Sequence, residues 1–244
     1  MDHITTPTKV IFDETPKHPN STRVIISPCY PGYGATIGNA LRRVLLSSLP
    51  GAAITAVKIR GVDHEFSAIE NVKEDVIEII QRIKLVRVKS HSSGMEKILL
   101  KVKGKKVVTA GDFEKNSQVE IANPDLEIAT ITHANGVLEI EAVVEQGVGY
   151  LSVESQSKDR FDVGVIMIDA SFSPILHVGY MVESVRVGKR TDYDKIVLDI
   201  ETDGAVSVKD AVKQSVAVLI EQFQSVAALL EHSHLQDEVE KIEE

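Results

Sequence analysis

The stretch PGYGATIGNALRRVLLSSLPG, residues 31–51, places glycines where a phosphate-binding loop could occur. Gly32 and Gly34 form a G-x-G, but a dinucleotide fingerprint would need glycine or alanine where Ile37 stands, and no G-K-[ST] follows for a P-loop. Glycine also permits a tight turn and close packing of a helix. The stretch is therefore predicted to be an entry turn followed by a closely packed helix, and a phosphate site is rejected.

The other polar side chains do not nominate an active site. His64 and Glu65 form half of a zinc-deaminase signature, but its P-C-x-x-C half cannot occur in a chain whose one cysteine is Cys29. Asp192 and Asp194 form a D-x-D pair that could hold Mg²⁺, although between two strands such a pair more often shapes a turn. We expect no catalytic residue, no cofactor and no metal in this chain.

Composition limits the class of protein. The chain has 244 residues, of which 43% are hydrophobic, enough for one large domain or two of ordinary size. Its formal net charge of −9 opposes non-specific attraction to nucleic acid. Cys29 has no partner for an internal disulfide, and no run of about eighteen apolar residues is present. These features predict a soluble, cytoplasmic protein with no membrane segment.

The helix expected from Ile37, ended by Pro50-Gly51, has two different sides. Apolar residues recur with a period of about 3.6, and they gather on one side: Ile37, Ala40, Leu41 and Val44, with Leu45 beside them. The opposite side carries Asn39, Arg42, Arg43 and Leu46. A leucine flanked by arginines has the composition of an interface centre, although a lone exposed leucine on a solvated face is common.

The rest of the chain alternates strands and helices. Strands are predicted at Lys9–Phe12 and Thr22–Ile26, before the first helix. Asn71 and Glu74 are spaced like a helix cap, and they predict a second helix. Its expected buried face is Val72, Val76, Ile79, Ile80 and Ile83. Several β-rich pieces follow between turn residues, so the middle of the chain is predicted to be a small sheet domain with one covering helix.

A long helix is predicted near the end of the chain. Ser207 and Asp210 form an S-x-x-D start signal after the strand-like KIVLDIET. Apolar residues then recur at spacings of four and three: Val208, Val212, Val216, Leu219, Phe223, Val226 and Leu230. With further apolar residues beside it, this face is wider than a lone surface helix needs.

The sequence GYGATIGNALRRVLLSSLPGAAIT closely resembles the signature of the bacterial-type RNA polymerase alpha subunit family, in which T-[IL]-G-N-A-L-R-R is followed by S-S-x-P-G. The resemblance continues through GVDHEFSAIENVKEDVIEII, NPDLEIATIT, IDASFSPI and GKRTDYDKIVLDIETDG, in the family's order. It therefore covers nearly the whole chain.

This resemblance implies an α+β fold of two subdomains. A discontinuous dimerisation subdomain, with two long helices packed on a sheet, would comprise residues 1–51 and 174–234, and an inserted, mostly β subdomain would comprise residues 52–173. Residues 235–244 would be a charged tail or the start of a linker, and the family's C-terminal domain that binds DNA and activators is expected to be absent. The implied dimer interface is Ile37, Leu41, Val44, Leu45, Val216, Leu219, Phe223, Val226 and Leu230.

The implied function is assembly. The chain would be a non-catalytic alpha subunit of DNA-directed RNA polymerase that forms a homodimer and a platform for the beta and beta′ subunits, in a nucleoid-associated holoenzyme with omega and sigma. The family's second arginine of R-R contacts the large subunit and falls on Arg43, so Asn39, Arg42 and Leu46 are implied to share that contact. DNA would be reached only through the complex. The alternatives are a metal-dependent enzyme that uses Asp192 and Asp194, and direct promoter binding by this chain.

Overall fold

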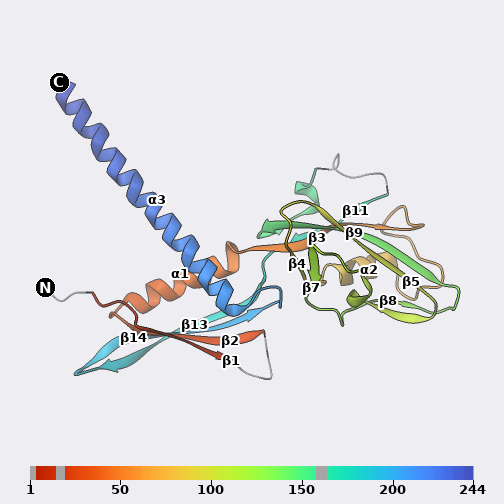
Figure 1. The fold of residues 1–244 in the computed structure, drawn as a ribbon, viewed down its shortest axis with the longest axis horizontal. Helices are drawn as coiled ribbons and strands as arrows, with labels where there is room; N and C mark the ends of the chain where they lie inside the picture. The colour runs from red at the N-terminus through yellow and green to blue at the C-terminus, as the bar shows by residue number, and fades with distance from the viewer. Residues whose placement is uncertain (1–3, 15–19, 158–163, 244) are drawn as a thin grey trace. The chain divides into compact units, whose positions relative to one another are not determined.

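The computed structural model describes residues 4–14, 20–157 and 164–243 (Figure 1). This part of the chain contains three α-helices and a mostly β body, so the predicted α+β class is confirmed. The chain separates into two compact units. Unit 1 lies within residues 1–48, 177–200 and 208–244, and unit 2 lies within residues 49–176 and 201–207. The short segment 201–207, which was predicted to belong to the dimerisation subdomain, thus groups with unit 2.

Unit 1 is built on a four-stranded sheet in the order β1, β2, β14, β13. The strands are β1 (Lys9–Glu14), β2 (Ser21–Cys29), β13 (Ile175–Val187) and β14 (Arg190–Thr202). In β2 the alternate residues Thr22, Val24 and Ile26 are buried, which is the pattern of a strand with one face against a core. Both strands predicted ahead of the first helix are confirmed, and both are longer than predicted.

The first helix, α1, spans Tyr33–Ser47. It therefore begins before Ile37, directly after the glycine turn. Pro50 and Gly51 do not end it, because they are already the first residues of strand β3. The predicted helix is confirmed, but its end was placed too late.

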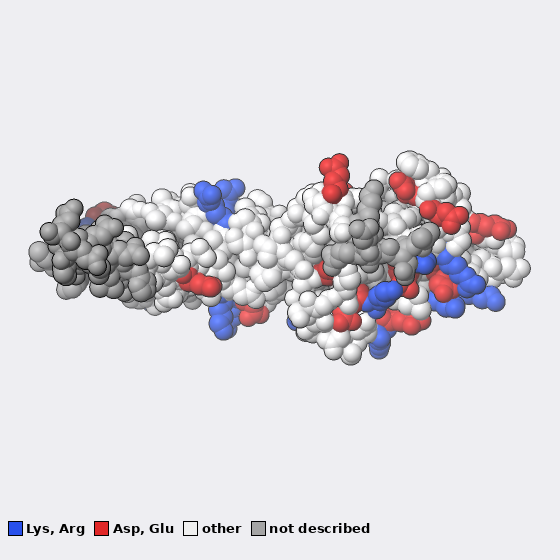
Figure 2. Space-filling view, turned by 90° about the horizontal axis from the view of Figure 1, so that it is seen from above, with Lys and Arg blue, Asp and Glu red and all other residues white. Residues whose placement is uncertain are grey.

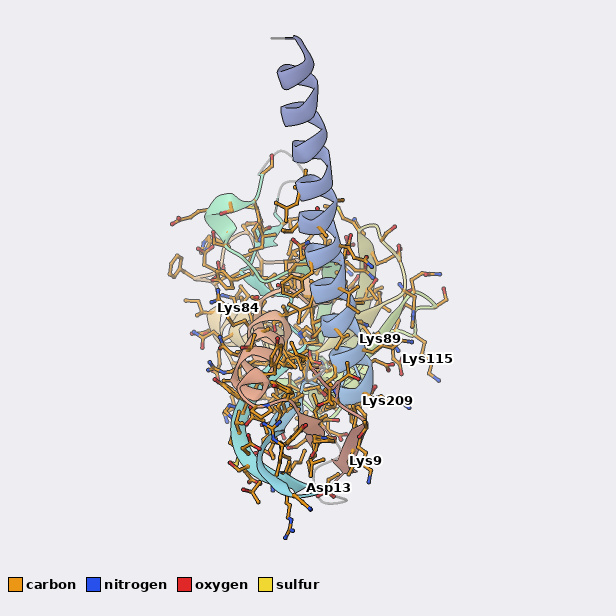
Figure 3. All side chains as sticks on the ribbon, turned by 90° about the vertical axis from the view of Figure 1, so that its left-hand side faces the viewer. Lys9, Asp13, Lys84, Lys89, Lys115 and Lys209 are labelled. Atoms are coloured by element: carbon orange, nitrogen blue, oxygen red, sulfur yellow. The ribbon has the colours of Figure 1, made fainter. Side chains whose placement is uncertain are left out.

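The third helix, α3, spans Val208–Glu243. It begins directly after Ser207, with Asp210 in its first turn, as the S-x-x-D signal predicts. Its first part lies beside α1 (Figure 3). The residues that anchor it are Val208, Ala211, Val212 and Ser215, all buried. From Val216 to Leu230 no side chain is buried, so α3 is anchored to unit 1 through its first two turns.

Unit 2 contains a six-stranded sheet and two smaller pairs of strands. The large sheet has the order β5, β9, β3, β4, β7, with β11 also paired to β3, and the pairs are β6 with β8 and β10 with β12. The strands are β3 (Pro50–Ile59), β4 (Val88–Ser90), β5 (Glu96–Lys103), β6 (Lys106–Thr109), β7 (Val119–Ile121), β8 (Glu127–Ile131), β9 (Val137–Val148), β10 (Tyr150–Leu151), β11 (Ile166–Met167) and β12 (Ala170–Ser171). The prediction of a small sheet domain with one helix is confirmed for this unit.

Helix α2 (Val76–Ile83) covers the core of unit 2. Val76, Ile79, Ile80 and Ile83 are buried as predicted, whereas Val72 packs against the same core from outside the helix. The predicted cap is wrong. Asp75 is the N-cap, and its carboxylate accepts a hydrogen bond from the Glu78 amide at 2.8 Å. Asn71 instead adopts a left-handed backbone with φ of 65°.

Candidate partner interface

The N-terminus of α1 is fixed by a carboxylate from a distant strand. The N-cap residue is Gly32, which has a left-handed backbone (φ 85°) and no side chain that could cap the helix. Asp194 of β14 takes that role, because its Oδ2 atom accepts hydrogen bonds from the amides of Gly32 and Gly34, both at 2.9 Å. A negative charge at this end of a helix also interacts favourably with the helix dipole. Asp194 therefore holds α1 to the sheet.

The prediction that the D-x-D pair shapes a turn is wrong. Asp192 and Asp194 lie inside β14, and the turn before this strand contains Gly188, whose φ is 60°. The Asp192 carboxylate is bound by the Arg190 guanidinium at 3.0 and 2.7 Å, and this contact lowers its pKa. The two carboxylates thus have different partners. Among the described residues, no three His, Cys, Asp or Glu side chains are grouped to hold a metal ion.

Two glycines let α1 approach the sheet closely. A Cβ atom at Gly34 would lie 2.8 Å from atoms of Asp194 and of Val182. A Cβ atom at Gly38 would lie 2.9 Å from the Tyr180 ring and 3.3 Å from Ile196. Distances this short cannot be accommodated without movement of the neighbouring groups. The close-packing interpretation of the glycine-rich stretch is therefore confirmed.

The four residues predicted to bind a large subunit are all exposed on α1: Asn39, Arg42, Arg43 and Leu46. Leu46 is 38% exposed, which is high for a leucine on a helix that otherwise packs on a sheet. Arg42 is partly held, since its Nε donates to the carbonyl of Val178 at 3.3 Å. Within the described part of the chain, the Arg43 guanidinium has no hydrogen bond or ion pair. This face offers a free planar donor group next to an apolar anchor.

The residues predicted to form a dimer interface divide into three groups by their exposure in the single chain. Leu41 and Leu45 are 2% and 0% exposed in the single chain, so they belong to the core of unit 1. Ile37, Val44 and Leu219 are half-buried. The other predicted residues are exposed: Val216, Phe223, Val226 and Leu230. Ile220 and Leu229 are also exposed apolar residues of α3, and they lie outside the predicted interface.

An aromatic cluster lies near the start of α1. The Tyr30 ring packs edge-on against Tyr33 and Tyr193, with ring centroids 6.1 and 6.2 Å apart. The Arg190 guanidinium lies over the rings of Tyr30 and Tyr193, at 5.9 and 5.3 Å from their centroids. Cys29, next to this cluster in sequence, is fully buried, and burial raises the pKa of its thiol. These contacts strengthen the attachment of the α1 entry turn to β14.

Sequence reasoning missed Asp194 as a positioning residue. Its partners, Gly32 and Gly34, lie about 160 positions earlier in the chain, so no local pattern pairs them. One signal was available: Pro31 and Gly32 precede the helix, and neither has a side chain that can cap it. A helix start without a local cap needs an acceptor from elsewhere in the fold.

A family model described as the RNA polymerase Rpb3/RpoA insert domain matches residues 57–173. The chain is 48% identical over 208 residues to the DNA-directed RNA polymerase subunit alpha of Roseiflexus castenholzii. The aligned residues make up 85% of this chain and 64% of that protein. It is 45% identical over 221 residues to the DNA-directed RNA polymerase subunit alpha of Moorella thermoacetica, and the aligned residues make up 91% of this chain and 70% of that protein. The chain thus spans slightly less than two thirds of the first relative. No helix in the described residues has the length and hydropathy to cross a membrane.

Proposed function

Since this chain belongs to the family of DNA-directed RNA polymerase alpha subunits, we propose that it is a non-catalytic assembly subunit, which forms a homodimer and binds the beta and beta′ subunits. It would act in the cytoplasm, in a nucleoid-associated holoenzyme with omega and sigma, and reach DNA only through that complex. Unit 1, with α1 on its sheet and α3 beside α1, would be the dimerisation part, and unit 2 would be the insertion.

The observation that carries the proposal is the exposed face of α1. Arg43 and Leu46 point away from a helix whose opposite side is held against the sheet at Gly34 and Gly38. Interface centres are enriched in arginine and in apolar side chains that fill pockets of a partner. Because Arg43 has no partner among the described residues, binding would not first require an internal ion pair to be broken.

The test is capture of the purified beta subunit by the tagged, full-length chain. Arg43→Ala and Leu46→Asp are expected to weaken capture by at least about tenfold, the effect of losing an interface hot spot. Their sedimentation mass should remain that of the unaltered chain, because neither residue belongs to the proposed dimer contact on α3.

Two matched substitutions control for surface changes as such. Arg23→Ala removes an exposed arginine of the same unit, which binds Asp199 at 2.7 Å on β14. Leu85→Asp places a charge at an exposed leucine of unit 2. Both controls should capture beta like the unaltered chain. Equal capture by Arg43→Ala, Leu46→Asp and the controls would reject the proposed face.

A further inference from the structure

Helix α1 is attached to the sheet at three successive places. At its start, Asp194 accepts hydrogen bonds from the Gly32 and Gly34 amides. In its middle, Gly38 lies against Tyr180 and Ile196 of β13 and β14. Near its end, Arg42 donates to the carbonyl of Val178 in β13. Of these three attachments, the first is the one made by a charged side chain to backbone amides.

We propose that Asp194 is a positioning residue for partner binding: it fixes the direction of α1 and thereby the place at which Arg43 and Leu46 meet a large subunit. This inference rests on the proposed function of that face. It extends the function from the residues that would contact the partner to a residue of another strand that does not share their exposed surface.

The local chemistry makes Asp194 hard to replace. Residue 32 has a left-handed backbone, which favours glycine, so a serine or aspartate there could not cap the helix without strain. The first turn of α1 contains no acidic residue that could interact with the helix dipole instead. Without Asp194, the amides of Gly32 and Gly34 lose their acceptor, and the start of α1 is free to move away from β14.

A movement at the start of the helix changes the direction of the whole element. An α-helix is a stiff rod because every turn is hydrogen-bonded to the next. Arg43 and Leu46 lie toward the opposite end of α1 from Gly34, so a tilt about the packed Gly38 would displace them relative to the sheet surface. Misplacement of contact residues reduces affinity even when every contact residue is still present.

The experiment measures beta capture by three variants of the full chain. Asp194→Ala removes the acceptor and the charge, and we expect it to weaken capture by about fivefold, the effect of a lost helix cap. Asp194→Asn keeps an acceptor oxygen and should recover most of the capture. Asp199→Ala is the matched control, because Asp199 lies on the opposite face of β14 and binds Arg23. It should capture beta like the unaltered chain.

A double-mutant cycle separates positioning from general stability. If Asp194 acts through the face of α1, Asp194→Ala should weaken capture much less in a chain that already carries Arg43→Ala. Sedimentation must show the same mass for all variants, so that loss of folding is not read as loss of binding. The Asn variant serves as the folded test case if the Ala variant fails this check.

The outcomes distinguish this inference from the proposed function. Weakened capture by Arg43→Ala together with normal capture by a folded Asp194→Ala would overturn the role of Asp194 alone. Equal losses for Asp194→Ala and Asp199→Ala, or an undiminished effect of Asp194→Ala in the Arg43→Ala chain, would overturn it too. Normal capture by Arg43→Ala would reject the proposed face, and the inference with it.

Discussion

Glu74 is a buried carboxylate whose partners compensate for its burial. Its side chain lies in unit 2, where the residue is 5% exposed. It accepts hydrogen bonds from the Thr130 amide at 2.6 Å and the Thr130 hydroxyl at 3.0 Å, and from Arg82 at 3.4 Å. Burial alone would raise its pKa, but these hydrogen bonds and the charge of Arg82 lower the pKa below its usual value. The segment ahead of α2 is thus tied to β8 by a charged group.

The sign of this shift predicts how acid affects the fold. A carboxyl group with a lowered folded pKa stabilises the protein above its unfolded pKa, about 4.3 for glutamate, and this contribution is lost as pH falls through the folded pKa. Glu74→Gln should lower the free energy of unfolding by about 2 kcal/mol at neutral pH, and it should lose less stability on acidification than the unaltered chain. Urea unfolding at neutral pH and at about pH 3 measures both effects.

A neighbouring glutamate provides the control for Glu74. Glu78 also binds Arg82, at 2.7 Å, but its side chain is exposed. Exposed pairs of this kind contribute at most about 0.5 kcal/mol, so Glu78→Gln should unfold nearly like the unaltered chain. The same acid sensitivity in Glu74→Gln and in the unaltered chain would contradict the assignment of this effect to Glu74.

At the scale of elements, the position of α1 depends on the absence of side chains. Alanine in the middle of a helix normally stabilises it by about 1 kcal/mol relative to glycine. At Gly38 the added Cβ atom would lie 2.9 Å from the Tyr180 ring and 3.3 Å from Ile196. The steric cost should exceed the gain in helix propensity, so we expect Gly38→Ala to lower the midpoint of thermal unfolding.

A second substitution tests whether the close contact is the cause. In a chain that carries Tyr180→Ala, the nearest obstacle is gone, and adding Gly38→Ala should cost much less than it does in the unaltered chain. Thr36→Ala, at an exposed position of the same helix, should be neutral or slightly stabilising. A higher unfolding midpoint for Gly38→Ala would mean that the contact with the sheet does not limit residue 38.

The sequence predicts elements well where their signals are local. The periodic apolar residues of α1, α2 and α3 and the β-branched runs of β1 and β2 each lie within one element, so the pattern alone identifies them. The α2 cap was misplaced because Asn71 and Glu74 have the spacing of a cap. In the structure the Glu74 carboxylate instead accepts a hydrogen bond from Thr130, 56 positions later. Competition of this kind between a local and a distant partner is decided only in the folded chain.

The candidate site divides in the same way. The exposed face with Arg43 and Leu46 follows from the helical period, whereas the attachment by Asp194 depends on two segments meeting in space. Leu41 and Leu45 show a further limit, because the period identifies an apolar side without telling whether the same chain or a second copy covers it. In the structure the sheet and helices of unit 1 leave them almost no exposed surface.

At the scale of the whole molecule, the described part of α3 carries several exposed apolar side chains. In the view of Figure 2, the surface of unit 1 outside the grey atoms is predominantly uncharged, with few lysines, arginines, aspartates or glutamates. The apolar residues of α3 that remain exposed in the single chain are Val216, Ile220, Phe223, Val226, Leu229 and Leu230. An exposed apolar surface of this kind is typical of a contact with another protein.

The periodicity of α3 favours a helix as the covering element. Val216, Leu219, Phe223, Val226 and Leu230 alternate spacings of three and four, the repeat by which helices interlock side chains. They continue the side that Val208 and Val212 use to anchor α3 in unit 1. The same helix of a second copy would present an identical stripe, which satisfies the requirement of a twofold contact that one surface meets itself.

Phe223 is the residue that tests this contact, because it is 70% exposed in the single chain and lies in the middle of the stripe. Burying it in a dimer would contribute roughly 1.5 to 3 kcal/mol, and a buried, unpaired carboxylate in its place would cost more than that contribution. We therefore expect Phe223→Asp to reduce the mass in sedimentation from that of two chains to that of one. Gln224→Asp adds the same charge at an exposed neighbouring position and should leave the dimer intact. If Phe223→Asp still sediments as two chains, α3 does not form the dimer contact, and the exposed apolar residues of this helix must be covered by a different partner.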